Sequence, residues 1–198
     1  MAGTIDYYYS HLSPWTYMGH QRIIDAAKRS GATLNFKPID TGKIFAASGG
    51  LPLAKRPVQR RDYRLVELRR WRDETGVHLN LQPKFHPVPD RCSALVAIAA
   101  ILSGLDIGPL SLALMRGCWA EEKNLADEDT VAAITSSIGL DGAGLLEKSK
   151  SEDVAAKLEK YTEDAMEDGV FGMPWYQVDG EPFWGQDRLS FVEKKLGL

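Results

Sequence analysis

The sequence predicts an α/β fold in which a block of helices interrupts a small β-sheet. Three observations support this fold class: a strand–helix–strand pattern opens the chain, helical patterns fill its middle, and a strand–strand–helix pattern closes it. A strand, a helix and a second strand in this order favour a right-handed crossover between parallel strands. We therefore expect the first and last segments to share one sheet, with the helical block inserted between them.

The opening segment predicts a strand followed by a capped helix. Residues Thr4–Ser10 are rich in β-branched and aromatic types, which favour strands. Ser13 and Pro14 then provide a favoured N-cap and a favoured first helical residue. We expect this helix to run from Pro14 to about Lys28 and to end at Gly31.

The second strand is predicted over Thr33–Ile39, where Pro38 indicates a strand at the edge of the sheet. The glycines and the proline of Asp40–Leu53 predict a loop. Helical patterns then continue without an internal repeat. The predicted helices cover Pro57–Thr75, Arg91–Leu102, Gly108–Glu122, Asp127–Ser137 and Glu147–Glu167.

The final segment predicts a hairpin and a last helix. Strands Trp175–Val178 and Pro182–Trp184 flank Asp179-Gly180, a pair that suits a tight turn. The last helix is predicted over Gln186–Leu196. Without the helical block, this order of elements is close to the thioredoxin arrangement, so we predict a thioredoxin-like fold with an inserted helical domain. The predicted domains are 1–45 together with 169–198, and the helical insertion 46–168.

Composition excludes several classes of protein. Of the 198 residues, 44% are hydrophobic and 26% are charged, as is usual for a soluble globular domain and not for a disordered or collagen-like chain. The longest apolar run, Ala94–Leu102, is too short to cross a bilayer, and no signal peptide is evident. Two cysteines, Cys92 and Cys118, form neither a disulfide framework nor a zinc set. We therefore expect a cytoplasmic protein that does not act at a membrane.

One short segment carries most of the positive charge of this chain, whose net charge is −3. It holds eight basic residues against only Asp62 and Glu67, so the rest of the chain is strongly acidic. The basic residues are Lys55, Arg56, Arg60, Arg61, Arg64, Arg69, Arg70 and Arg72. A solvated helix face is one interpretation, and a positive wall beside a site for a small anion is the other. A nucleic-acid partner is not expected, because no nucleic-acid motif accompanies this segment.

The loop after the first predicted strand is the first candidate site. Ligands in open α/β sheets bind beyond the carboxyl ends of the strands, and a helix N-terminus there favours an anion such as a thiolate. The Ser13 hydroxyl could donate a hydrogen bond to a bound thiolate, or it could only cap the helix. His11 and Trp15 flank Ser13 closely enough to touch a substrate.

Two later segments could join this site. Pro174 precedes a strand, where a cis bond would present the backbone of Met173 to a peptide-like ligand; from the residues alone, a trans bond is favoured. Asp187, next to Gln186, could cap the last helix or bind a ligand ammonium group. Trp15, Trp175 and Trp184 fall in the three site segments and would suit a flat aromatic substrate.

Other chemistries are argued against by spacing. The four histidines show no metal-ligand spacing, and no G-x-S-x-G motif or third group completes a serine-hydrolase triad. Ser13 and Thr16 occupy the positions at which a Cys-x-x-Cys pair would serve disulfide chemistry. A disulfide oxidoreductase is therefore not expected.

Three motifs in order resemble the 2-hydroxychromene-2-carboxylate isomerases, relatives of the kappa-class glutathione transferases in the DsbA-like thioredoxin superfamily. They are Ser13-Pro14-Trp15, Gly169–Pro174 and Phe183–Leu189, with Trp119–Asp127 between them. This resemblance covers essentially the whole chain. It implies a homodimer with glutathione as cofactor and a small aromatic carboxylate as substrate.

The resemblance also implies roles for single residues. Ser13 would hydrogen-bond the glutathione sulfur, and Met173 with Pro174 would pair with its cysteinyl part. Gln186 and Asp187 would hold the γ-glutamyl end. Arg60 stands where relatives often carry a lysine that faces the glycine carboxylate or the substrate. The wall of Arg60, Arg61 and Arg64 would attract the substrate carboxylate.

Two positions depart from the pattern of these relatives. Gly50 replaces an asparagine that commonly follows glycine, which puts one glutathione contact in doubt, and Asp90-Arg91 replaces an Asn-Thr or Asn-Ser pair. The activity implied is a cis–trans isomerisation in aromatic catabolism through reversible thiolate addition. The alternatives are a kappa-like glutathione transferase or peroxidase, and a thioredoxin-fold binding module without catalysis.

Overall fold

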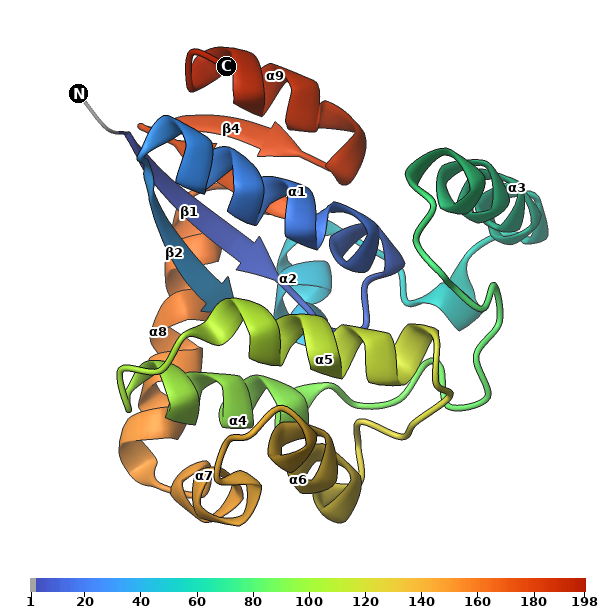
Figure 1. Cartoon of the computed structure of the whole chain (residues 1–198). Helices are drawn as coiled ribbons and strands as arrows, with labels where there is room; N and C mark the ends of the chain where they lie inside the picture. The colour runs from blue at the N-terminus through green and yellow to red at the C-terminus, as the bar shows by residue number, and fades with distance from the viewer. Residues whose placement is uncertain (1–2) are drawn as a thin grey trace.

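The computed structural model describes residues 3–198 and contains one four-stranded sheet with helices on both faces (Figure 1). The strands are β1 (Thr4–Tyr9), β2 (Thr33–Pro38), β3 (Trp175–Val178) and β4 (Glu181–Trp184). The α-helices are α1 (Pro14–Ser30), α2 (Thr41–Ser48), α3 (Val58–Thr75), α4 (Arg91–Ile101), α5 (Ile107–Trp119), α6 (Glu128–Ser137), α7 (Gly142–Lys148), α8 (Glu152–Glu167) and α9 (Leu189–Lys195). Two short 3₁₀ helices, η1 (Leu53–Lys55) and η2 (Gln186–Arg188), complete the order.

The sheet joins the first and last segments of the chain, as predicted. Its strand order is β2-β1-β3-β4, with β1 parallel to β2 and antiparallel to β3. β2 lies at an edge, which agrees with its terminal Pro38. The β3–β4 turn is formed by Asp179 at φ 48° and Gly180 at φ 85°, the pair of positive φ angles that a tight hairpin needs.

Side chains of β1 alternate between two apolar clusters. Ile5, Tyr7 and Tyr9 pack with α1 and α9 on one face, while Tyr8 packs on the other face with α2 and α8. This alternation follows from the two-residue period of a strand, whose successive side chains point to opposite faces. The carboxyl end of β1 therefore emerges between two covered faces, where its loop is held from both sides.

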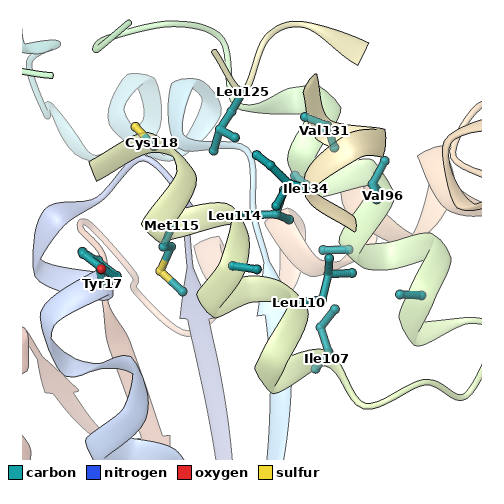
Figure 2. Packing of buried hydrophobic residues seen from close by; sticks show 14 of the residues in the cluster. Tyr17, Val96, Ile107, Leu110, Leu114, Met115, Cys118, Leu125, Val131 and Ile134 are labelled. Atoms are coloured by element: carbon teal, nitrogen blue, oxygen red, sulfur yellow. The ribbon is translucent and has the colours of Figure 1, made fainter. Parts of the chain in front are cut away.

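The largest apolar cluster lies among the inserted helices and extends onto α1 through Tyr17 and Met18. Figure 2 shows Leu110 and Leu114 of α5 beside Ile134 of α6 and Val96 of α4. Close approach of α5 and α6 depends on Gly117, since a Cβ there would lie 2.8 Å from Ile134 Cδ1. The inserted helices are thus packed directly against the sheet-covering helix α1.

Three boundaries differ from the sequence-based prediction. The predicted loop Asp40–Leu53 contains helix α2, because the Asp40 carboxylate caps the Lys43 amide and Ile44 is fully buried. The predicted helix Glu147–Glu167 is two helices, α7 and α8, separated at Ser149–Ser151. The last predicted helix begins as the 3₁₀ turn η2 before α9.

The remaining predicted helices are present with small shifts at their ends. Gly31 and Gly76 end α1 and α3 in the left-handed conformation, and Asp127 caps α6 through the amide of Thr130. The predicted helix Gly108–Glu122 is α5, which begins one residue earlier and ends at Trp119. Across residues 3–198, no helix is both long and apolar enough to cross a membrane.

Candidate active site

Ser13 lies at the start of α1, in the loop that leaves the carboxyl end of β1. Its Oγ accepts a hydrogen bond from the Thr16 amide at 3.2 Å and donates one to the Met173 carbonyl at 3.2 Å. The hydroxyl therefore caps the helix and also contacts the backbone of Met173, which lies just before β3. Both interpretations of Ser13 are compatible in one geometry, because capping leaves the side chain at the positive end of the helix.

The three predicted site segments meet at this end of the sheet. Met173–Pro174 is a cis peptide bond, so the trans bond favoured by the residues alone is wrong. The Gly185 amide donates to the Pro174 carbonyl at 2.9 Å, which ties the third segment to the second. Ser13, Met173 and Gly185 are thereby linked through one short chain of backbone and hydroxyl contacts.

The third segment has a backbone shape that depends on glycine. Gly185 has φ 97° and ψ 148°, and a Cβ there would lie 2.5 Å from Asp187 Oδ1. The Asp187 carboxylate does not cap η2, which corrects the capping interpretation; it forms an exposed pair with Arg188 at 2.8 Å. Asp187 therefore remains available to a cation, in competition with Arg188.

Gln186 is turned inward. Its side chain is 3% exposed, its Cβ lies under Gly19 of α1, and its Nε2 has no hydrogen-bond partner among the described residues. A ligand above the loop would meet the backbone of Gln186, and its side chain fixes the loop from below. A buried donor without a partner costs stability, so this amide is the unsatisfied polar group of the loop.

His11 points into the protein, which corrects its predicted role as a substrate contact. It is 1% exposed, and its ring nitrogens lie 3.1 Å from Ser93 Oγ and 3.3 Å from Ser111 Oγ. Burial lowers the pKa of His11 to about 3, with a smaller contribution from His20. His11 is therefore neutral at physiological pH and anchors the loop to α4 and α5.

A second buried histidine supports the same strand. His20 of α1 contacts the Tyr7 hydroxyl at 3.2 Å and the Gly108 carbonyl at 3.0 Å. Burial lowers the pKa of His20 to about 4, although its bond to Gly108 acts in the opposite direction. His20 is therefore neutral at physiological pH and links β1 and α1 to the start of α5.

A cavity of about 500 Å³ lies beside α3, η1 and the segment that precedes α4. Its lining combines apolar side chains with charged ones. The lining residues are Leu53, Ala54, Arg61, Asp62, Arg64, Leu65, Leu81, Gln82, His86 and Pro87. The volume and the mixed lining suit a small organic ligand with one charged group.

Arg64 is the central cation of this cavity. Its guanidinium carbon lies 5.9 Å from the centroid of the buried Trp119 ring, and it forms no salt bridge within residues 3–198. Burial and the nearby charge of Arg56 lower the pKa of Arg64 to about 10, so it remains charged at neutral pH. A half-buried cation without a carboxylate is suited to receive an anionic ligand.

His86 lines the cavity and was not singled out from the sequence. Its ring centroid lies 4.5 Å from that of the Trp119 ring. Burial and the charge of Arg64 lower the pKa of His86 to about 4. No local pattern marks this histidine, because its place depends on how the segment before α4 packs.

Other predicted residues lie apart from the cavity lining. Arg60 is exposed on α3, whereas Arg61 and Arg64 face the cavity. Trp175 is 6% exposed and packs in the core, which corrects its suggested contact with a substrate. Trp184 is 52% exposed and lies across Gly172, and Trp15 is half-buried against the helical cluster.

Gly50 follows the left-handed Gly49 at the end of α2. A Cβ at Gly50 would lie 2.6 Å from Phe45 Cδ1 and 3.2 Å from Phe45 Cα. The side-chain amide expected at this position would therefore collide with Phe45 in the present geometry. Among the described residues, no cluster of metal-ligating side chains occurs.

The profile of the DSBA-like thioredoxin domain matches residues 4–197. The chain belongs to this DsbA-like family. The DsbA-like chain is 29% identical over 198 residues to a 2-hydroxychromene-2-carboxylate isomerase of Sphingobium xenophagum, covering 99% of both proteins. It is 24% identical to the glutathione S-transferase kappa 1 of Caenorhabditis elegans, covering 97% of this chain and 90% of that one.

Solved structures agree with this relationship. A solved structure of a 2-hydroxychromene-2-carboxylate isomerase superposes on this DsbA-like protein with a TM-score of 0.80 at 26% identity. The match covers 98% of this chain and 94% of that one. The predicted thioredoxin-like α/β fold is confirmed, and the full-length similarity to isomerases identifies the DsbA-like chain as an enzyme.

Proposed function

We propose that this protein is a glutathione-dependent isomerase that interconverts 2-hydroxychromene-2-carboxylate and trans-o-hydroxybenzylidenepyruvate. The observation that carries the proposal is the position of Ser13: a hydroxyl at the N-terminus of α1, 3.2 Å from the Met173 carbonyl. The likeness to proteins named 2-hydroxychromene-2-carboxylate isomerase supports the reaction. The likeness to a kappa-class glutathione transferase supports the cofactor.

The residues at the end of the sheet fit glutathione. Gly185 leaves a cradle that a Cβ would fill, and the exposed Asp187 carboxylate beside it suits an ammonium group such as that of the γ-glutamyl end. The Gln186 side chain is buried, so its backbone would contribute to this end. The backbone of Met173, ahead of Pro174, would pair with the cysteinyl part.

Glutathione, when bound, would supply a thiolate that adds reversibly to the conjugated carbon of the substrate, so that rotation about the former double bond becomes possible. The Ser13 hydroxyl would donate its hydrogen bond to the sulfur instead of to the Met173 carbonyl. The N-terminus of α1 favours a negative charge at the same point. The Ser13 hydroxyl and the N-terminus of α1 would thus stabilise the thiolate of glutathione, although the protein has no cysteine at the site.

The cavity beside α3 would hold the substrate. Arg64 would bind the substrate carboxylate, since it is charged, half-buried and free of a carboxylate partner in the described chain. Arg61 lines the same cavity and would add to the positive potential, and Asp62 opposes it. Trp15, two residues after Ser13 and outside the cavity lining, would contact the aromatic ring near the sulfur. The family pattern alone supports Arg60 as a glutathione contact, and Gly50, which lacks the asparagine amide of the relatives, would offer glutathione only its backbone.

Isomerisation measured by ultraviolet absorbance with and without glutathione tests the proposal. We expect glutathione to be required and Ser13→Ala to lower turnover more than tenfold, because the thiolate loses a hydrogen bond. Ser137→Ala, which removes a hydroxyl at the far end of α6, is the matched control. Turnover unchanged in folded Ser13→Ala, or equal without glutathione, would contradict the proposal.

A kappa-like conjugating activity is the second candidate, favoured by the transferase relative. Assay with a chloro-dinitrobenzene separates it from the isomerase, because conjugation consumes glutathione and isomerisation regenerates it. A homodimer in the cytoplasm remains our prediction, which sedimentation equilibrium and cell fractionation would test. Calorimetry without any glutathione binding at millimolar levels would favour a non-catalytic module.

A further inference from the structure

Asp90 makes contacts that set it apart from the other aspartates at helix starts. Asp40, Asp106, Asp127 and Asp141 each cap their own helix, with the carboxylate accepting from a backbone amide two or three residues on. Asp90 occupies the same position at α4 but makes no such bond. Its side chain is directed away from its own helix.

The Asp90 carboxylate instead reaches two segments distant in sequence. Oδ2 accepts from the Ser10 hydroxyl at 2.6 Å and from the Thr41 hydroxyl at 2.9 Å. Ser10 lies at the end of β1, and Thr41 is the first residue of α2. Asp90 Oδ2 therefore links the start of α4 to the loop after β1 and also to the start of α2.

The contact continues to Ser13 through Ser10. The Ser10 Oγ accepts from the Leu12 amide at 3.2 Å, and the Ser10 carbonyl accepts from the Ser13 amide at 3.1 Å. The first turn of α4 also holds His11, the residue after Ser10, since Ser93 Oγ lies 3.1 Å from His11 Nδ1. The whole turn from Ser10 to Ser13 is thus fixed from α4.

We propose that Asp90 is a positioning residue, which sets the place of the Ser13 hydroxyl by holding Ser10. This inference rests on the proposed function, because Ser13 is taken as the group that contacts the thiolate. Both partner hydroxyls donate to a single oxygen, so an acceptor oxygen is needed at this point and a negative charge is not. Asparagine can supply that oxygen, whereas leucine of similar size cannot.

Hydrogen exchange in the full chain tests the positioning directly. In Asp90→Leu we expect the amides of Leu12 and Ser13 to exchange at least tenfold faster, and in Asp90→Asn we expect them to stay near the wild-type rate. Ser10→Ala removes the same link from the other end and serves if Asp90→Leu does not fold. Asp127→Leu, which removes the cap of the distant α6, is the matched control and should leave both amides unchanged.

Kinetics and thiol titration then connect position to chemistry. We expect kcat to fall at least fivefold in Asp90→Leu and Ser10→Ala, with the substrate KM within twofold and recovery in Asp90→Asn. The pKa of the thiol of bound glutathione, followed by thiolate absorbance, should rise in Asp90→Leu and Ser10→Ala, and we expect the same direction in Ser13→Ala. A merely structural role of Asp90 would lower stability without moving this titration.

The outcomes separate this inference from the proposed function. Unchanged exchange at Leu12 and Ser13 in both Asp90→Leu and Ser10→Ala overturns it. So does faster exchange with unchanged kcat and unchanged thiol pKa. If the wild-type protein shows no glutathione-dependent activity, the proposed function fails, and the role of Ser13 fails with it. If wild-type activity is normal but the Asp90 variants are unaffected, only the positioning role of Asp90 is refuted.

Discussion

The two sides of the candidate site are built from different material. At the end of the sheet, the site consists of backbone groups, one hydroxyl and a glycine with positive φ, held from below by neutral histidines. Beside α3, it consists of long charged side chains and a cavity of about 500 Å³. The sheet side depends on local backbone geometry, which few sequences satisfy, whereas the helical side can change its ligand by single substitutions.

The largest effect should come from the histidines below the Ser13 loop. The folded-state pKa values of His11 and His20, about 3 and about 4, lie below the unfolded value of about 6.5. The unfolded chain therefore binds more protons below pH 6.5, so stability is full above that pH and is lost as the pH falls. Together they should lower the free energy of unfolding by about 4 kcal/mol between pH 8 and pH 5.

Urea unfolding at pH 8, 6.5 and 5 measures this slope. His11→Asn and His20→Asn should each flatten it, because they remove one protonation that the fold excludes. Asp90 contributes to the pH dependence of the free energy of unfolding with the opposite sign. Burial raises its pKa in the folded state, so this group stabilises the fold as the pH falls. A slope that is identical in wild type and in both variants would exclude His11 and His20 as its source.

Gly185→Ala should produce the next largest effect and confine it to the sheet side. Its φ of 97° and ψ of 148° are strained for any residue with a Cβ, and the Cβ would displace Asp187. We expect glutathione affinity to fall by about 100-fold in calorimetry, which corresponds to about 3 kcal/mol of binding free energy. Gly139→Ala, at φ 84° with open space around the Cβ, is the control and should bind glutathione normally.

Arg64→Met should confine its effect to the helical side. Methionine retains much of the apolar contact with Trp119 and removes the charge. Loss of one charge-assisted bond predicts a rise in substrate KM of about tenfold or more, with the glutathione dissociation constant unchanged. Arg69→Met is the matched control, because Arg69 is exposed on the same helix, lies outside the cavity lining and has no proposed ligand contact. Equal effects of both variants would show that only the general positive potential matters.

The contrast between local backbone geometry and tertiary packing also explains which features the sequence predicted. Ser13-Pro14 and Asp179-Gly180 are local signals, in which neighbouring residues decide a cap or a turn, and both are confirmed. Helix α2 was missed because its glycines indicated a loop, while its stabilisation comes from the Asp40 cap and the burial of Ile44.

Side-chain direction was the part of the site that the sequence did not decide. His11 is two residues from Ser13, yet it points to α4 and α5 because Ser93 and Ser111 are placed there by the fold. Arg64 and Arg60 lie on one helix, but only the packing of α3 against the segment before α4 selects Arg64 for the cavity. His86 reaches the site only through that same packing. Such choices depend on tertiary contacts between distant segments, so no local pattern reveals them.

Substitution of Gly50 should give the smallest effect of these variants. If asparagine at this position supplied a missing glutathione contact, Gly50→Asn would tighten glutathione binding. The new Cβ would instead approach within 2.6 Å of Phe45 Cδ1. We expect a loss of about 1 kcal/mol in the free energy of unfolding and no gain in affinity, because Phe45 must shift.

The double variant Phe45→Ala/Gly50→Asn removes the obstacle and decides between the two explanations. If glutathione binds more tightly in the double variant than in Phe45→Ala, an amide at position 50 can reach the ligand, and Phe45 is what excludes it here. If affinity is the same, the Ser13, Met173 and Gly185 segments suffice to bind glutathione, and the amide is dispensable in this chain. Tighter binding in the single variant would show that α2 moves freely, in which case the Asp40 cap and the buried Ile44 do not fix this end of the site.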